Sequence, residues 1–375
     1  MLRLFPPKRK QAPEGYWRNG LSKAQVKSCW GKVSVKVQRL KAKTGEGKQV
    51  YYDACLDESG WSPEALKRLV ELSSRLPYEE SSHLAKLFGL DISGSSLETL
   101  TSPYAQSCTQ AVTTLLKQHT SEALQHVPSA KEVDVKGRVM VLQIDGVYVL
   151  GRPEEGSCPG LEIKSAVLYP QNSPSDRWML ADRCSVEDFL PLLSGLLCEA
   201  SLIPGDTLVG LGDGAKWIDN SFYHLNTVRI TDVFHTVKYL DIVMQAMNWN
   251  EDKRTKHRRD WYRGDSSAKD WLAHYLPEPE TWMTWSEDAL SALHYLEQRL
   301  DSMDYPRFKD KGYPIGSGQV EAMNKSVIGH RLKRSGMHWS ETGARSMASL
   351  RAQTCAKHPF IDFDQLRFEA FSLAA

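Results

Sequence analysis

The chain has 375 residues with a formal net charge of +1 and 41% hydrophobic residues, enough to bury a real core in two or three domains. No run of the sequence reaches the roughly eighteen apolar residues that span a bilayer, and the first seven residues lack a signal-peptide core. The seven cysteines show no zinc-site spacing and suit reduced thiols. We therefore expect a cytoplasmic protein without a membrane partner, and composition argues against disulfide-stapled and structural-zinc proteins.

Residues 1–60 are predicted to form a basic arm. Residues 1–50 carry thirteen Lys and Arg, among them Lys8, Arg9 and Lys10, against two glutamates. A basic arm on a nearly neutral chain is typical of proteins that hold phosphates, although a solvated tail has the same composition. Alternating residues at 32–37 and 49–52 flank a Gly-rich turn, which predicts a β-hairpin.

Residues 61–130 have a helical hydrophobic period. Ser-Pro at 62–63 is typical of a helix start, a second helix is expected over 77–88, and a third begins near residue 93. Two short helices around Gly89 match a helix-turn-helix, whose second helix enters a major groove. We expect DNA binding here; a plain helical hairpin is the alternative.

Residues 138–239 alternate strands and helices. Predicted strands cover residues 139–144, 161–169, 207–211 and 227–233, and helices cover 186–201 and begin again near His235. Two of the strands end on an aspartate followed by glycine, at Asp145 and Asp213. An isolated aspartate there is often only a turn former. In an open α/β sheet, however, ligands bind outside the carboxyl ends of the strands.

Residues 240–310 are predicted to be helical and contain five tryptophans, Trp249, Trp261, Trp271, Trp282 and Trp285. Tryptophans mostly fill helical cores. The sharper hypothesis is that one of them stacks on a base flipped out beside a cleavage site. A basic run in the same segment supplies three candidate DNA-binding residues, Arg254, Arg258 and Arg259.

Residues 311–375 are expected to open with a Gly-Ser-Gly turn at 316–318 and continue as a long helix that carries Glu321. Basic residues follow the glutamate and are candidates for holding phosphates beside a scissile bond, with a solvated helix face as the alternative. These residues are Lys325, Arg331, Lys333 and Arg334.

Asp145, Asp213 and Glu321 together predict a metal site. Carboxylates suit hard divalent cations, and two Mg²⁺ (or Mn²⁺) ions about 3.5–4 Å apart serve phosphodiester cleavage and joining. The expected chemistry is nucleic-acid phosphotransfer. A rival interpretation is an oxidoreductase, because residues 210–215 fit a Gly-x-Gly-x-x-Ala dinucleotide fingerprint and Asp232 lies at the distance of a ribose ligand. It leaves Asp145 unexplained and turns the Asp213 carboxylate toward a pyrophosphate.

The motifs Gly-Asp-Gly-Ala-Lys-Trp-Ile at 212–218, Asp232-x-x-His235, Gly-Ser-Gly-x-x-Glu at 316–321 and Arg-Leu-Lys-x-Ser-Gly-Met-x-Trp-Ser at 331–340 resemble insertion-sequence DDE transposases of the ISKra4 type. The resemblance covers roughly residues 62–357. It implies an α/β fold with a ribonuclease-H-like catalytic core, a mixed sheet flanked by helices, formed by residues 138–239 and 311–375. An α-helical insertion at 240–310 and a mainly helical N-terminal DNA-binding region complete the expected architecture. Relatives often carry cysteine pairs near the amino terminus, where this chain has only Cys29 and Cys55.

The resemblance also implies roles. Asp145, Asp213 and Glu321 become the catalytic metal ligands, with Asp145 bridging two ions, and His235 contacts a phosphate or caps a helix. The partner would be double-stranded DNA, both element terminal repeats and target, bound by a homodimer or higher oligomer at a bacterial nucleoid. A transposase-derived protein that binds DNA without catalysis is the remaining alternative.

Overall fold

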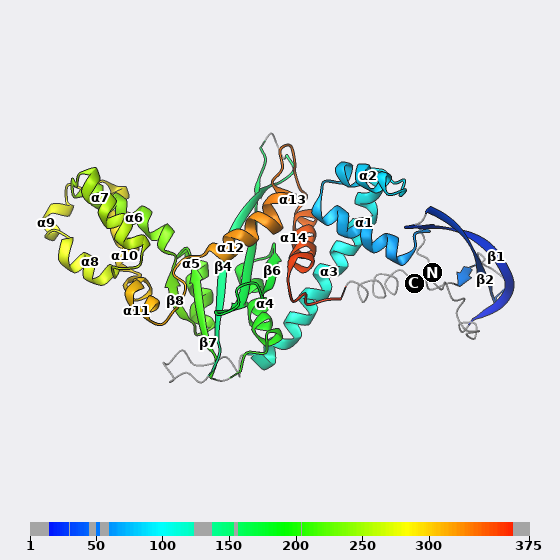
Figure 1. Cartoon of the computed structure of the whole chain (residues 1–375), viewed down its shortest axis with the longest axis horizontal. Helices are drawn as coiled ribbons and strands as arrows, with labels where there is room; N and C mark the ends of the chain where they lie inside the picture. Colours follow the sequence, from blue (N-terminus) through cyan, green and yellow to red (C-terminus); the bar gives the residue numbers. More distant parts are fainter. Residues whose placement is uncertain are drawn as a thin grey trace. The chain divides into compact units, whose positions relative to one another are not determined.

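The structure is a computed structural model that divides into two compact units, residues 1–104 and residues 105–375 (Figure 1). The residues it describes are 15–29, 31–44, 50–52, 60–123, 137–153, 157–203 and 205–362. Lys8, Arg9 and Lys10 lie outside these ranges. Within them, no helix combines the length and the apolar character needed to cross a membrane.

The amino-terminal unit opens with an antiparallel three-stranded sheet in the order β1-β2-β3. Its strands are β1 (Tyr16–Ser28), β2 (Gly31–Ala42) and β3 (Val50–Tyr52). The predicted hairpin of residues 32–37 with 49–52 is only partly right: β2 pairs with β3 through residues 38–40, whereas residues 32–37 pair with β1. The longer β1–β2 ribbon was not predicted, because the first strand mixes Lys, Gln and Ser with only a few apolar residues.

The helices of this unit match the predicted ones closely, as α1 (Pro63–Arg75), α2 (Tyr78–Leu87) and the start of α3 (Gly94–Ala123). Ser62 caps α1 by accepting a hydrogen bond from the Ala65 amide at 3.3 Å. Buried side chains of the three helices, including Leu69 and Leu97, form one cluster. These three helices therefore share an apolar core.

The carboxyl-terminal unit is built on a mixed five-stranded sheet in the order β6-β5-β4-β7-β8. The strands are β4 (Val139–Leu150), β5 (Gly160–Pro170), β6 (Trp178–Asp182), β7 (Thr207–Gly212) and β8 (Val228–Thr231). Strands β4, β7 and β8 run parallel, whereas β5 pairs antiparallel with β4 and β6. The predicted α/β class with a mixed sheet flanked by helices is confirmed. The short β6 escaped prediction.

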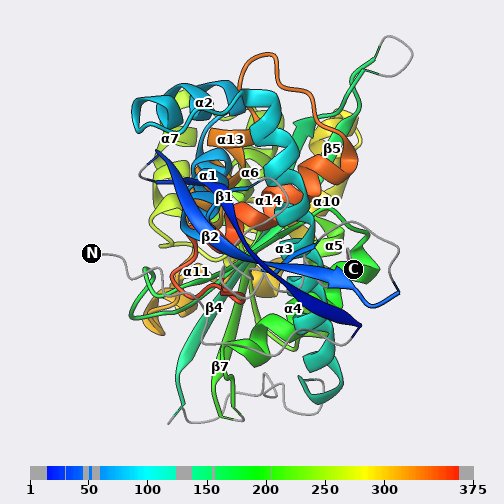
Figure 2. The same cartoon turned by 90° about the vertical axis from the view of Figure 1, so that its right-hand side faces the viewer.

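Helices cover this sheet (Figures 1 and 2). Helix α4 packs against β5 and β6, α5 against β7 and β8, and α14 against β5 and β6. Their bounds are α4 (Val186–Glu199), α5 (Lys216–His224) and α14 (Glu341–Cys355). Buried residues of the strands, such as Leu142, Ile144 and Leu168, form the core beneath them.

A helical segment follows β8 and begins with α6 (Val233–Ala246), which packs against α7 and α10. The other helices are α7 (Glu251–Tyr262), α8 (Ala268–Tyr275), α9 (Pro279–Trp282), α10 (Glu287–Glu297), η1 (Leu300–Met303) and α11 (Tyr305–Asp310). Trp261 and Trp271 are buried, and Trp261 Nε1 donates to Thr236 Oγ1 at 2.9 Å. These two tryptophans therefore belong to the core, as expected for most tryptophans in a helical segment.

The predicted helix after residue 318 is present, since helical structure runs without a break from Gly318 to Leu332, but the π-helical stretch inside it was not predicted. The chain forms α12 (Gly318–Met323), a π-helical stretch η2 (Asn324–Gly329) and α13 (His330–Leu332), and then turns at Gly336 before α14. Gly336 has a φ of 75°, a conformation that continues no helix. Buried side chains recur every three or four residues along this stretch, at Val320, Met323, Val327, Ile328, Arg331 and Leu332.

Candidate metal and phosphotransfer site

Asp145 does not end its strand, contrary to the prediction, since β4 continues to Leu150 and pairs with β5 throughout. The prediction failed because the Asp145-Gly146 pair looks like a turn. On its other side, however, the parallel ladder with β7 stops at the pair Gln143 and Leu211. Asp145 therefore lies where the β4–β7 ladder ends, and Asp213 follows the last residue of β7. Both aspartates occupy the same carboxyl edge.

The electrostatics agree with this proximity. Burial raises the pKa of the Asp145 carboxyl, and the negative charge of Asp213 raises it further. Two hydrogen bonds oppose the rise, from the Gly146 amide at 2.7 Å and from Asn324 Nδ2 at 2.7 Å. A cation bound beside Asp145 would relieve the repulsion that the Asp213 charge exerts on it.

Asn324 ties the glutamate helix to the first aspartate. Asn324 lies three residues after Glu321, at the first position of η2. Its Nδ2 donates to Asp145, and its Oδ1 accepts from Ser165 Oγ at 2.7 Å. Ser165 stands directly opposite Asp145 in β5. Strand β4, strand β5 and the helix that carries Glu321 are thus fixed to one another at the site.

The loop after β7 is held by the helical segment. Asp213 Oδ1 accepts from the Ala215 amide at 2.8 Å, and the Asp213 carbonyl accepts from Tyr295 Oη at 2.6 Å. The next carbonyl, of Gly214, accepts from Arg299 Nη2 at 2.6 Å. Gly214 has a φ of 83°, and a Cβ there would lie 2.5 Å from Tyr295 Oη. Helix α10 therefore fixes the position of the second aspartate.

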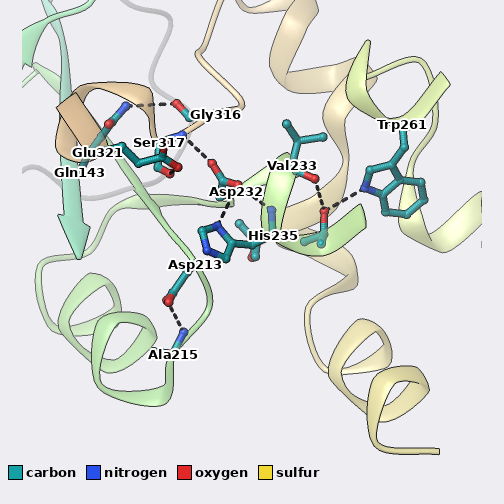
Figure 3. A network of polar contacts seen from close by, with 12 residues as sticks. Gln143, Asp213, Ala215, Asp232, Val233, His235, Trp261, Gly316, Ser317 and Glu321 are labelled. Carbon is teal, nitrogen blue, oxygen red and sulfur yellow. Dashed lines mark hydrogen bonds and ion pairs between the residues drawn. The ribbon is translucent and has the colours of Figure 1, made fainter. Parts of the chain in front are cut away.

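Buried Asp232 and half-buried His235 bond to each other beside Asp213 (Figure 3). Asp232 Oδ1 accepts from the His235 amide at 2.7 Å and lies 3.1 Å from His235 Nδ1, and Asp232 Oδ2 accepts from the Ser317 amide at 2.6 Å. Burial favours the neutral acid, yet the bonds from His235 and Ser317 hold the pKa of Asp232 below its usual range. The same hydrogen bond raises the pKa of His235. Asp232 therefore joins the start of α6 to the turn before α12.

Gln143 fixes the same turn from the sheet. Its Oε1 accepts from the Gln319 and Val320 amides at 3.1 and 3.0 Å, which are donors at the start of α12. Its Nε2 donates to Tyr169 Oη at 2.8 Å. Two side chains, Gln143 and Asp232, thus satisfy three backbone amides at this helix start. The position of Glu321 follows from them.

The ligand geometry differs in part from the predicted set. Among the residues that the structure describes, Asp232, His235 and Glu321 bring three ligand atoms within 4.8 Å of one another. Asp145 and Asp213 stand outside this group. Both oxygens of Asp232 already accept bonds from the protein, so Asp232 is a weaker ligand candidate than its distance indicates. Within the described part of the chain, the Glu321 carboxylate accepts one long contact, from Ser317 Oγ at 3.5 Å, which leaves it suited to a cation.

Arg331 is not the exposed cation that was predicted. Its side chain is 1% exposed, and its guanidinium lies 5.0 Å from the Trp339 ring centre. Arg331 lies four residues after the buried Val327 and next to the buried Leu332, so it falls on the buried face of its helix. Arg331 therefore belongs to the packing of the helices behind the site and not to a phosphate-binding face.

The other predicted DNA-binding residues divide into two groups. Arg254 and Arg258 are half-buried and pair with Asp241 at 3.0 and 2.7 Å, so the protein itself engages them. Asp241 lies on α6, which packs against α7, a pairing that the basic run alone did not reveal. The residues at the surface, fully or in part, are Arg259, Lys325, Lys333 and Arg334.

Several site residues were missed. Gln143 is a polar residue in an otherwise apolar strand, and Asn324 follows Glu321 at helical spacing; both signals were visible in the sequence. Tyr295 and Arg299 gave no such signal, because only the fold brings α10 to the loop after β7. Neither protein-family models nor curated proteins gave a match to this chain. The site must therefore be interpreted from its own geometry.

Proposed function

We propose that the chain is a DNA transposase of an insertion sequence, with a ribonuclease-H-like core that cleaves and joins DNA strands. The observation that carries this proposal is the meeting of Asp145 and Asp213 at the end of the β4–β7 ladder, with the helix of Glu321 tied to Asp145 through Asn324. Three carboxylates on a mixed α/β sheet are a donor set for hard divalent cations.

The charge and burial of the carboxylates support binding of such ions. The pKa of Asp145 is raised by burial and by the Asp213 charge, so the pair binds a positive charge more readily than two separated carboxylates. When bound, two Mg²⁺ ions would supply activation of the attacking oxygen and stabilisation of the leaving oxygen. Asp145 and Asp213 would hold them, and Glu321 would complete the ligands. Asp232 and Gln143 position the helix of Glu321.

The oxidoreductase alternative finds less support. Gly210 and Gly212 lie inside β7, where a Cβ would come within 2.5 and 2.6 Å of Phe222 and Ile218. These glycines permit α5 to pack closely on the strand. Asp232 is fully buried and bonded to His235 and Ser317, so a ribose hydroxyl has no access to it. The glycines of the fingerprint therefore serve helix packing, and its acidic residue serves internal hydrogen bonds.

The test uses the full chain, Mg²⁺ and DNA that carries the ends of its element. We expect strand cleavage by the wild type and none by Asp213→Asn, which removes a ligand charge while preserving volume. Asp252→Asn, on an exposed residue of α7, is the matched control and should cleave normally. Cleavage by Asp213→Asn would refute the assigned site. Duplex binding without cleavage by the wild type would instead favour a transposase-derived binding protein.

A further inference from the structure

The β1–β2 ribbon has an unusual charge distribution. Residues 15–44 contain eight Lys and Arg and not one Asp or Glu, in a chain whose net charge is only +1. The two strands pair antiparallel along their length, with a register shift between Arg18 and Leu21. Figure 2 shows them as a strongly twisted ribbon. No carboxylate within the ribbon's own sequence compensates this charge.

The register places the lysines against one another. Lys23 stands directly opposite Lys36, and Lys27 opposite Lys32. Residues directly opposite in an antiparallel pair share one face, and like charges in such pairs are destabilising. Lys27 Nζ lies 5.0 Å from the Trp61 ring centre, whereas Lys23, Lys32 and Lys36 are exposed. The paired lysines repel each other, and an anionic partner bound to this face would relieve that repulsion.

One face of the ribbon is apolar and packs against the protein, and the other is polar and exposed. The pair Val26 and Val33 lies on the opposite face, and Val26 is buried. On the cationic face, Gln25 pairs with Ser34 between the lysines, and both are exposed. This face therefore offers positive charges for phosphates with hydrogen-bonding groups between them.

One end of the ribbon is anchored to the helices of its unit. The Lys27 amide donates to the Gly60 carbonyl at 2.8 Å, and the Ser62 amide donates to the Lys27 carbonyl at 2.7 Å. Ser62 is the cap of α1. Two backbone hydrogen bonds thus attach this end of the ribbon to the start of α1.

We propose that the cationic face of the β1–β2 ribbon binds double-stranded DNA through the major groove. The B-DNA major groove is about 12 Å wide and admits a two-stranded ribbon, whereas side chains cannot read the narrow major groove of duplex RNA. Lys23, Lys32 and Lys36 contact phosphates, and Gln25 and Ser34 face base edges. The choice of DNA rests on the proposed function; the surface itself lies far along the sequence from the phosphotransfer site.

The test measures binding of the full chain to a labelled duplex over a range of salt concentrations. The affinity falls as salt rises. In the triple variant Lys23→Ala, Lys32→Ala, Lys36→Ala this fall should be shallower, with the slope of log affinity against log salt smaller in magnitude by about 2.7, at about 0.9 for each lost phosphate contact. The control removes three exposed lysines outside the ribbon, Lys269, Lys311 and Lys357, and should keep the wild-type slope. Equal behaviour of the two triples would overturn the proposal.

A second variant guards against misfolding. Lys23→Glu should pair with Lys36 and leave the unfolding temperature at or above that of the wild type, while duplex affinity falls. Leu21 is 64% exposed on the same face, and an exposed apolar side chain among lysines also suits an anionic membrane surface. Binding to anionic lipid vesicles is therefore measured as the competing alternative. Binding to vesicles, with duplex affinity unchanged in both variants, would refute DNA as the partner. Ribbon-dependent duplex binding without cleavage would refute the proposed enzyme and leave the ribbon surface standing.

Discussion

Asn324→Ala tests whether the asparagine positions the Asp145 carboxylate for the proposed cleavage. The substitution removes the 2.7 Å bond to Asp145 and the 2.7 Å bond from Ser165 Oγ. A hydrogen bond to a charged group contributes about 1.5–3 kcal/mol. If all of it is lost from the transition state, the cleavage rate falls about 10- to 150-fold, at a factor of ten for every 1.36 kcal/mol.

A pH profile separates positioning from a general loss of structure. The bond from Asn324 lowers the pKa of Asp145, so its removal raises that pKa further. The acid limb of the cleavage profile should therefore move to higher pH, because the carboxylate is protonated earlier as pH falls. DNA affinity should remain unchanged.

Ser326→Ala is the matched control for this experiment. Ser326 lies in the same π-helical stretch, and its Oγ donates to the Met323 carbonyl at 3.3 Å. It should leave both the rate and the acid limb as in the wild type. A wild-type rate and an unmoved acid limb in Asn324→Ala would refute the positioning role, and equal losses in both variants would indicate a folding defect.

Three further predictions follow from the same contacts. Trp261→Ala should lower the free energy of unfolding by about 3–5 kcal/mol, since the ring is fully buried, whereas half-buried Trp285→Ala should cost clearly less; equal losses in denaturant titrations would contradict this. Gly214→Ala should abolish cleavage and keep duplex binding, because its positive φ and the Tyr295 hydroxyl leave no room for a Cβ; normal cleavage would show that the loop adapts. Asp232 raises the pKa of His235, so protonated His235 stabilises the fold fully below about pH 6.5 and this contribution disappears as pH rises through the raised folded-state pKa. The difference in unfolding temperature between wild type and His235→Ala should therefore shrink from acidic to alkaline pH, and a difference that grows would reverse the assigned sign.

The sequence revealed those features that depend on local pattern. Capped helices such as α1 and apolar strands such as β7 appear within a residue or two of their predicted positions, because Ser-Pro starts and apolar runs act locally. Asp145 shows the limit of this approach. The following glycine looked like a turn, yet alternating residues up to Leu150 extend the pairing with β5.

The contacts that complete the site depend on tertiary structure. Tyr295 reaches the Asp213 carbonyl from 82 residues away, a relation that no local pattern encodes. Arg331 looked like a surface cation because it belongs to a basic run. In the structure it falls on the buried face of its helix, and its guanidinium packs on the ring of Trp339 from a later turn of the chain.

The most direct measurement of the central proposal is the position of bound Mn²⁺ in crystals of the full chain, located by its anomalous scattering. We predict density between Asp145 and Asp213, with carboxylate oxygens of both at about 2.0–2.6 Å and Glu321 completing the site. Asp232 should keep its bonds to His235 and Ser317. Mn²⁺ bound only by Asp232, His235 and Glu321, with Asp145 and Asp213 left without metal, would contradict the proposed phosphotransfer site.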